Sequence, residues 1–230
     1  MKKSLDLDRT AEARSAPEAL AAEIRSRIWD GQLAPGQRLV ESDLVLDLAA
    51  SRGSVREALR LLVAQGLVTV EMHRGARVRR FSRAECLSLI EVREALEGLA
   101  ARLAAERADP AGVARLGAIH REAEAAAADN DVEAYLRIND ALHEAILDAG
   151  GNSMIREHLF LAQLMFFRVQ TRFLRAHDLA SAQREHAAII AQIAARDGAG
   201  AEAAMRRHIG ATREVVQAAP GRFFEPETRE

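Results

Sequence analysis

The spacing of apolar and polar residues changes twice along the chain. Residues 1–16 show no apolar periodicity, and we expect this N-terminal extension to be disordered. Beyond them the apolar positions recur with helical spacing and predict three short helices. The first ends at Gly31, the second covers 39–50, and the third runs from its N-cap Ser51 to about Gln65.

Two short runs rich in β-branched residues follow, at 67–70 and 76–78. The loop between them, 71–75, carries a glycine where a β-hairpin needs one. Three helices followed by a hairpin is the order of a winged helix-turn-helix. We therefore expect residues 17–81 to form such a domain, with the hairpin as its small wing.

A second helical regime starts at Ser82, where Ser-Arg-Ala-Glu has the spacing of a capping box. The fourth helix of this regime is apolar nearly all round, which is typical of a helix central to a bundle. The pattern predicts a mainly α chain whose residues 82–218 form a six-helix all-α bundle, followed by a flexible tail, 219–230. The expected helices are 84–107, 111–128, 131–149, 153–176, 180–196 and 199–217.

The formal net charge of −2 looks unfavourable for binding nucleic acid, but the charges are unevenly distributed. Residues 17–83 contain 11 basic and 8 acidic side chains, whereas residues 84–230 contain 17 basic and 23 acidic ones. A basic first third joined to an acidic remainder can mark a nucleic-acid-binding module fused to a different domain.

Three further features narrow the class of protein. No apolar run approaches the roughly 20 residues of a membrane span, and the N-terminus lacks the apolar stretch of a signal peptide. We expect a cytoplasmic protein with no membrane partner. Cys86 is the single cysteine, so a metal site, if present, must use the seven histidines with Asp, Glu or Asn.

The third predicted helix has the character of a DNA-reading helix. It packs on one face and presents Arg52, Arg56 and Arg60 on the other. Arginines at the start of such a helix can bind guanine in the major groove, while Ser hydroxyls bind phosphate. Three arginines alone could equally be a solvated cationic face. The order of elements and the charge asymmetry favour DNA.

The residues also match a known family over about 17–80. The segments Gly31–Leu39 (GQLAPGQRL), Ser51–Leu59 (SRGSVREAL), Gly66–Val68 and Arg74–Ala76 resemble the GntR family of bacterial transcription regulators. Together with the pattern above, this resemblance gives the following candidate DNA-binding residues: Arg38, Ser51, Arg52, Ser54, Arg56, His73, Arg74 and Gly75.

Two departures from that family fall around the reading helix. Ala49 stands where the family usually has the glycine of the turn, which is harmless only if the turn needs no positive φ. Gly53-Ser54 replaces the commoner Thr-Pro at the start of the helix. We therefore expect the operator sequence to differ from those of relatives.

Three histidines in the helical region are placed on inward-facing helix surfaces. Asn139 and His143 lie one turn apart on the inner face of 131–149, a spacing that lets two side chains bind one cation. His186 and His208 share faces with apolar residues of the last two predicted helices. Each alone is more simply a hydrogen-bonded core residue, but three together favour a shared divalent ion.

This region resembles the FCD effector-binding domain of the FadR-type branch of the GntR family. The matching segments lie around His143, His186, His208 and the run Arg93–Glu97 (REALE), and six helices resemble the VanR-like subgroup. The resemblance implies a divalent metal ion, Zn²⁺ or Ni²⁺, and a small carboxylate effector that completes its coordination. The implied metal ligands are Asn139, His143, His186 and His208.

The choice of Asn139 changes the expected chemistry. Its neutral carbonyl oxygen replaces the carboxylate of many relatives, so the ion keeps its full charge and attracts an anion more strongly. Asp140 is a rival fourth ligand, but periodicity points it outward. Arg93 could bind the effector carboxylate as a fork, or form a salt bridge with Glu97 four residues on.

The sequence therefore predicts a homodimeric, metabolite-responsive DNA-binding regulator and no enzyme. One winged helix reads one half-site, so a palindromic operator requires two copies. An alternative is a metal-sensing regulator in which the ion itself is the signal. A less favoured alternative is a metal-dependent hydrolase, which would need a general base close to the ion.

Overall fold

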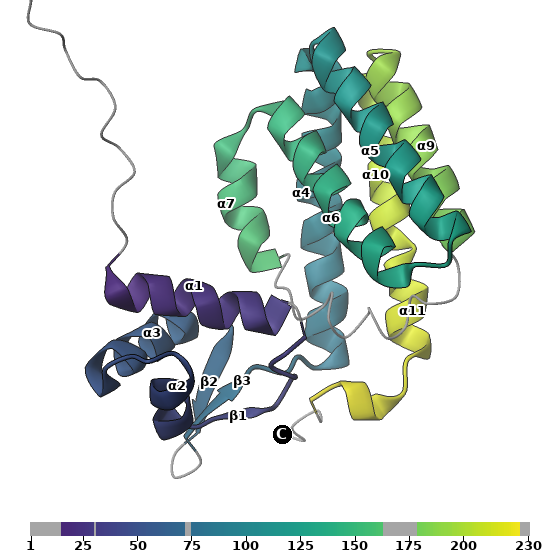
Figure 1. The fold of residues 1–230 in the computed structure, drawn as a ribbon. Coiled ribbons are helices and arrows are strands. Elements are labelled where there is room, and N and C mark those ends of the chain that lie inside the picture. Colours follow the sequence, from purple (N-terminus) through teal and green to yellow (C-terminus); the bar gives the residue numbers. More distant parts are fainter. Residues whose placement is uncertain (1–14, 30, 72–74, 163–178, 226–230) are drawn as a thin grey trace, which may run out of the picture. The chain divides into compact units, whose positions relative to one another are not determined.

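The structure is a computed structural model that describes residues 15–29, 31–71, 75–162 and 179–225. The chain divides into two compact units, Met1–Arg79 and Arg80–Glu230 (Figure 1). Each unit has its own buried apolar residues. No helix among the described residues is long and apolar enough to cross a membrane.

The first unit is a winged helix-turn-helix, as predicted. Its three strands form an antiparallel sheet in the order β1-β3-β2. The pattern missed β1, because two residues are too few to show an alternation. The elements are α1 (Ala16–Trp29), β1 (Arg38–Leu39), α2 (Glu41–Asp47), α3 (Arg52–Ala64), β2 (Val68–Glu71) and β3 (Gly75–Val78).

Helix α3 forms where the sequence predicts it, for local and tertiary reasons. The Ser51 hydroxyl accepts a hydrogen bond from the backbone N–H of Ser54 at 3.1 Å, which caps the helix. Such a cap contributes about 1 kcal/mol. One face of α3, including Val55 and Leu62, is fully buried, and α3 packs against α1 with its buried Ile24. This packing leaves the opposite, arginine-bearing face exposed.

The turn between α2 and α3 does adopt the conformation that usually calls for glycine. Ala49 has a φ of 48°, in the left-handed region. A residue with a Cβ is strained there. The missing glycine is therefore a true departure with an energetic consequence for this unit.

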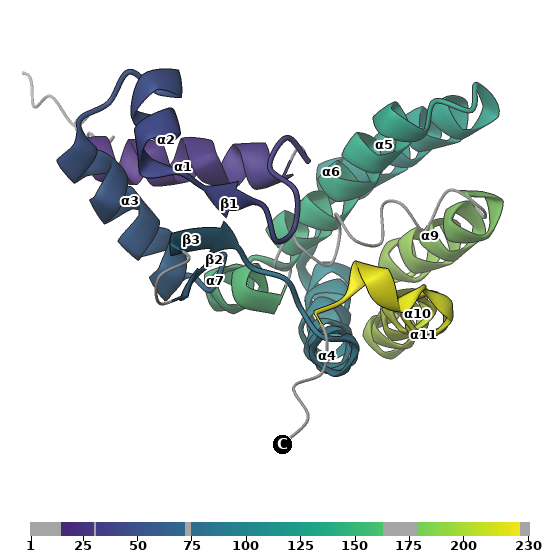
Figure 2. The same cartoon turned by 90° about the horizontal axis from the view of Figure 1, so that it is seen from below.

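The second unit is an all-helical bundle. Helix α4 packs against α6, α7, α9, α10 and α11, and Figure 2 shows α10 and α11 beside it. The helices are α4 (Arg83–Arg107), α5 (Pro110–Ala128), α6 (Val132–Gly150), α7 (Ser153–Ala162), α9 (Leu179–Ala194), α10 (Gly198–Gly210) and α11 (Thr212–Ala218).

Side-chain caps stabilise the N-termini of most of these helices. Ser82 and Glu85 form the predicted capping box at the start of α4. The carboxylates of Asp109, Asp131 and Asp197 each accept a hydrogen bond from the backbone N–H three residues later. At the end of α6, Gly150 lies so close to α4 that a Cβ would come within 2.9 Å of the Ala100 carbonyl. These signals explain why the predicted helix starts agree with the structure.

The bundle differs from the prediction in its last helix. The helix predicted over 199–217 is two helices, α10 and α11, which meet at Ala211. The hydroxyl of Thr212 donates to the carbonyl of Ile209 at this junction. The helix predicted over 153–176 is described only as far as Ala162, and its remainder lies outside the described residues.

Part of the tail predicted to be flexible is packed against the bundle. After Ala219 the chain makes a 3-10 turn, η1 (Gly221–Phe223), and Phe224 is buried. The Arg83 guanidinium donates to the carbonyls of Val216, Gln217 and Ala219, the last two at 2.7 Å. It also lies 4.5 Å from the centre of the Phe224 ring. The polar composition of the tail gives no sign of these tertiary contacts, which hold its described residues against the bundle.

Candidate functional site

The exposed face of α3 carries the predicted DNA-reading side chains. Arg52 and Arg56 are both exposed near the start of the helix, and the Ser54 hydroxyl lies 2.9 Å from that of Ser51. Arg56 forms a surface ion pair with Glu41 of α2 at 2.8 Å. Arg52 has no hydrogen bond or ion pair to any described residue, so it is available to a ligand.

The wing carries the other predicted DNA contacts, of which only part is described. Gly75 begins β3 with a φ of 79°, a conformation suited to glycine. A Cβ at Gly75 would lie 3.9 Å from Nε of Arg38, so the exposed Arg38 side chain lies beside the wing. His73 and Arg74 lie outside the described residues. Arg77 of β3 donates a hydrogen bond to the Gly36 carbonyl at 3.0 Å, within the domain.

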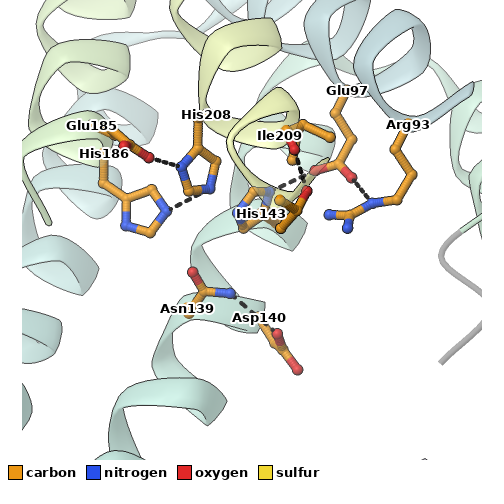
Figure 3. A network of polar contacts seen from close by, with 10 residues as sticks. Arg93, Glu97, Asn139, Asp140, His143, Glu185, His186, His208 and Ile209 are labelled. Atoms are coloured by element: carbon orange, nitrogen blue, oxygen red, sulfur yellow. Dashed lines mark hydrogen bonds and ion pairs between the residues drawn. The ribbon is translucent and has the colours of Figure 1, made fainter. Parts of the chain in front are cut away.

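The three inward histidines meet inside the helical bundle. His143 of α6, His186 of α9 and His208 of α10 are each at most 3% exposed. Each offers one ring nitrogen, and these three atoms lie within 4.8 Å of one another (Figure 3). Nε2 of His186 and Nε2 of His208 are 3.1 Å apart. Three imidazole nitrogens at this spacing have the chemistry and the separation of a divalent metal site.

The carboxylates of Glu97 and Glu185 are hydrogen-bonded to two of these histidines. Nδ1 of His143 lies 2.6 Å from Oε2 of Glu97, and Nδ1 of His208 lies 2.7 Å from Oε2 of Glu185. Because a carboxylate accepts hydrogen bonds, a neutral imidazole in this arrangement donates through Nδ1 and leaves Nε2 to bind an ion. This is the arrangement by which carboxylates commonly orient metal-binding histidines.

Asn139 lies beside the histidines, one helical turn before His143. It is 6% exposed, and in Figure 3 its amide oxygen is on the side that faces the histidines. Its nitrogen donates to Oδ1 of Asp140 at 3.4 Å, and Asp140 points away from the cluster. The neutral oxygen of Asn139 is thus the better placed fourth donor, and the buried residues fit a divalent ion.

Arg93 is linked to the histidine cluster by the carboxylate of Glu97, which contacts both Arg93 and His143. Its Nε donates to Oε1 of Glu97 at 2.7 Å, and both side chains are at most 6% exposed. The other oxygen of Glu97 is the one bonded to His143. The salt bridge expected as an alternative therefore exists, and it places the Arg93 guanidinium beside the histidine site.

The residues that a hydrolase or a thiolate site would need are placed elsewhere. Glu144 follows His143 in sequence but is 46% exposed and pairs with Arg156 at 2.6 Å. Cys86 is buried, and burial is the main cause that raises the pKa of its thiol to about 12. A thiol with that pKa stays protonated near neutral pH and does not ligate an ion as a thiolate.

Sequence reasoning missed the role of Glu97 and Glu185. The sequence pattern indicates Glu97 only as the helical partner of Arg93, and Glu185 directly precedes His186 but is bonded to His208. No local pattern identifies the histidine that a glutamate meets on another helix. Only the packing of α4 on α6 and of α9 on α10 decides these pairs.

Comparisons with known proteins agree with this architecture. The profile described as "Bacterial regulatory proteins, gntR family" matches residues 17–78, and the FCD domain profile matches residues 88–211. A regulator of Paraburkholderia xenovorans, BphR, is 31% identical, with 90% of this chain and 87% of that protein covered. LutR of Bacillus subtilis is also 31% identical, with 82% and 95% covered.

Solved structures share the fold at lower identity. A GntR regulator of Rhodococcus sp. RHA1 superposes with a TM-score of 0.75 at 22% identity, over 90% of this chain and 100% of that one. McbR/YncC of Escherichia coli gives a TM-score of 0.76 at 21% identity, over 89% and 98%. Given both profiles and the extent of these matches, the chain belongs to the GntR family of bacterial regulatory proteins and contains an FCD domain.

Proposed function

We propose that this transcriptional regulator binds operator DNA through α3 and the wing, and that a small carboxylate metabolite, bound at a divalent metal ion in the helical unit, controls its DNA affinity. The observation that carries the proposal is the meeting of three buried imidazole nitrogens beside a buried arginine. Burying three imidazoles is unfavourable unless their nitrogens are satisfied, and a shared ion would satisfy the three nitrogens that face one another.

Different residues of the cluster are proposed to bind the ion and the effector. His143, His186, His208 and Asn139 would hold the ion, Zn²⁺ or Ni²⁺, with Glu97 and Glu185 as orienting partners. The bound ion supplies a Lewis-acid position for a carboxylate oxygen. Arg93 would bind the same anion through its guanidinium, which suits carboxylate geometry. This role involves no catalysis.

The protein is proposed to act as a homodimer in the cytoplasm, where operator DNA is found. One α3 helix reads one half-site, and two are needed to read a palindrome tightly. Light scattering coupled to gel filtration should give twice the chain mass of 25.1 kDa. A monomer that binds a palindrome tightly would contradict this part. The VanR-like subgroup remains a prediction based on resemblance.

The relatives do not fix the sign of regulation. GlaR of Escherichia coli, 29% identical, is named a repressor, whereas the Glc operon protein of that organism, 30% identical, is named an activator. The effector must favour one conformation of the regulator in either case. Titration of the effector into the protein–DNA complex measures that sign directly.

The DNA-binding part is tested by Arg52→Ala. Duplexes selected by the natural protein from random sequence serve as the probe. We expect specific binding to weaken by roughly 1–3 kcal/mol, because a base contact is lost. Arg115→Ala is the matched control: it removes the same charge from an exposed site on the helical unit. Equal affinities of the two variants for the selected duplex would refute the assignment of α3.

The metal-binding part is tested by elemental analysis of purified protein. The double variant His143→Ala, His208→Ala should lose the stoichiometric metal, because two of four ligands are gone. His158→Ala, at an exposed position of α7, is the control and should retain it. Metal retained by the double variant would show that the ion binds elsewhere.

A metal-sensing role is the alternative outcome of the same titration. If the ion alone changes DNA affinity and no carboxylate adds to the effect, the ion is the signal. If carboxylates change affinity only when the metal is bound, the ion is a co-ligand, as proposed. Measurable hydrolysis that depends on the metal would favour the hydrolase. Glu144, the residue considered as its general base, lies at the surface and pairs with Arg156.

A further inference from the structure

The segment that follows α11 returns to the linker between the two units. This C-terminal strap comprises residues 219–225, and the linker comprises residues 80–82, where the helical unit begins. Figure 2 shows the strap running from α11 toward the first turn of α4. We infer that the strap restrains the linker and thereby makes the regulator selective for one spacing of its two half-sites on DNA. The inference rests on the proposed binding of operator DNA by a homodimer.

Two hydrogen bonds join the strap directly to the linker. Nη2 of Arg80 donates to the backbone carbonyl of Arg222 at 2.8 Å. The backbone N–H of Glu225 donates to the carbonyl of Phe81 at 2.9 Å. Phe81 is 2% exposed, so the second bond is made by a buried residue. The strap thus holds the linker through one side chain and through the backbone.

The strap can restrain the linker because it is itself fixed to the bundle. Ala219 and Phe224 are both buried. The guanidinium of Arg83 in α4 donates to the Ala219 carbonyl at 2.7 Å and lies 4.5 Å from the centre of the Phe224 ring. A segment that is anchored in this way transfers the rigidity of the bundle to the residues that it binds.

The linker has little slack on either side of these contacts. The backbone N–H of Arg79, the last residue of the winged unit, donates to the Leu67 carbonyl at 2.9 Å. Ser82 is the N-cap of α4. Arg80 and Phe81 lie between these two fixed points, and each makes one of the hydrogen bonds to the strap. The strap therefore acts on the residues whose backbone freedom would let the winged unit turn.

A restrained linker has a consequence for a dimer that reads two half-sites. The two α3 helices would be presented at one separation, and half-sites at another separation could be reached only by distorting the linker or releasing the strap. A flexible linker would instead tolerate several separations with little loss of affinity. We therefore expect the strap to determine which operator spacing is bound, while α3 determines which bases are read.

Two matched pairs of variants test the restraint on the full chain. Glu225→Pro removes the N–H that donates to Phe81, whereas Glu225→Ala keeps it. Phe224 has a φ of −112° and a ψ of 156°, which is compatible with a following proline. A truncation after Ala219 removes all partners of the linker in the strap, whereas a truncation after Glu225 keeps them.

Limited digestion with trypsin measures the restraint without DNA. Trypsin cleaves after arginine, and a folded chain is cut after Arg79 or Arg80 only when the linker opens. Compared with its matched control, Glu225→Pro should be cut there about two- to tenfold faster, as the loss of one hydrogen bond implies. The truncation after Ala219 should be cut at least about tenfold faster than the truncation after Glu225, because both hydrogen bonds are lost.

Cleavage after Arg115, at an exposed position of α5, is the internal control. Mass spectrometry of the fragments separates this site from the linker. Equal rates at the linker within both matched pairs would overturn the inference. An equal acceleration after Arg115 would show general unfolding of the variant instead of release of the linker, and would overturn it as well.

The spacing preference is measured on duplexes that the natural protein selects from random sequence. Two base pairs inserted between the half-sites should lower the affinity of the truncation after Glu225 by at least about tenfold. For the truncation after Ala219 we expect a loss at least about threefold smaller, since a freer linker reaches both half-sites. A duplex with a single half-site should bind both truncations equally, because α3 is unchanged.

The outcomes distinguish this inference from the function on which it rests. If the natural protein selects no duplex with two half-sites, the proposed dimeric reading fails and the spacing role fails with it. If such duplexes are bound but the insertion weakens both truncations equally, the proposed function stands and the role of the strap is refuted. Faster cleavage of the linker without greater tolerance of spacing would refute that role in the same way.

Discussion

Ala49 occupies a position at which the family usually has glycine, and its backbone conformation is one that favours glycine. Its φ of 48° shows that the turn between α2 and α3 needs a left-handed residue, which the sequence supplies without glycine. A Cβ in that conformation costs roughly 1–2 kcal/mol. The turn lies between the buried Leu44 of α2 and the capped start of α3 at Ser51.

Ala49→Gly should therefore stabilise the domain. The gain should be about 0.5–1 kcal/mol, because relief of the strain exceeds the extra freedom of glycine in the unfolded chain. Urea unfolding followed by fluorescence of Trp29, the single tryptophan, measures it.

Ala50→Gly is the matched control for this prediction. Ala50 is not among the described residues with positive φ, so glycine there should destabilise by about 0.4–1 kcal/mol. Shifts of the same sign in both variants would contradict the strain at Ala49.

At the scale of elements, one arginine connects the two ends of the helical unit. Arg83, in the first turn of α4, donates to three carbonyls at and just beyond the end of α11. Such carbonyls have no partner within their own helix, and a cation there also interacts favourably with the helix dipole. The packed segment 219–225 follows directly and covers Arg83 with Phe224.

Arg83→Met should loosen this end of the unit. Methionine keeps much of the apolar stem but removes the donors, so we expect a loss of about 1–3 kcal/mol in the free energy of unfolding. Urea unfolding followed by far-ultraviolet circular dichroism provides the measurement. Arg184→Met, at an exposed position of α9, should change the midpoint little. Equal midpoints for both variants would show that the contacts of Arg83 add no stability.

At the scale of the whole molecule, the chain forms two compact units, and the two proposed binding sites lie in different units. The histidine cluster lies entirely within Arg80–Glu230, whereas Trp29 lies within Met1–Arg79. A ligand stabilises the part of the protein whose folded form it binds. An ion bound by the histidine cluster should therefore affect the unfolding of the two units differently.

Zn²⁺ should raise the unfolding temperature of the helical unit alone. At free metal 100-fold above its Kd the gain is about 2.7 kcal/mol. For a unit of this size that is roughly 5–10 °C. Circular dichroism, dominated by the helical unit, should show the shift, while Trp29 fluorescence should not. A parallel shift of both signals would indicate that the units unfold as one.

The sequence by itself determined the class of fold and most element boundaries. Helical spacing, N-caps and the hairpin glycine are local features, and local features act through the nearest few residues. The same periodicity placed Asn139, His143, His186 and His208 on inward faces. Their roles as metal ligands remain a prediction, but their burial is confirmed.

Only the tertiary structure decided which of these groups meet. The pairing of Glu97 with His143 joins residues 46 positions apart, and that of Glu185 with His208 joins residues 23 apart. The packed tail beside Arg83 and the two-residue strand β1 also depend on partners that are far away in the sequence. Contacts of this kind follow from the packing of whole helices and strands, which no short stretch of sequence specifies.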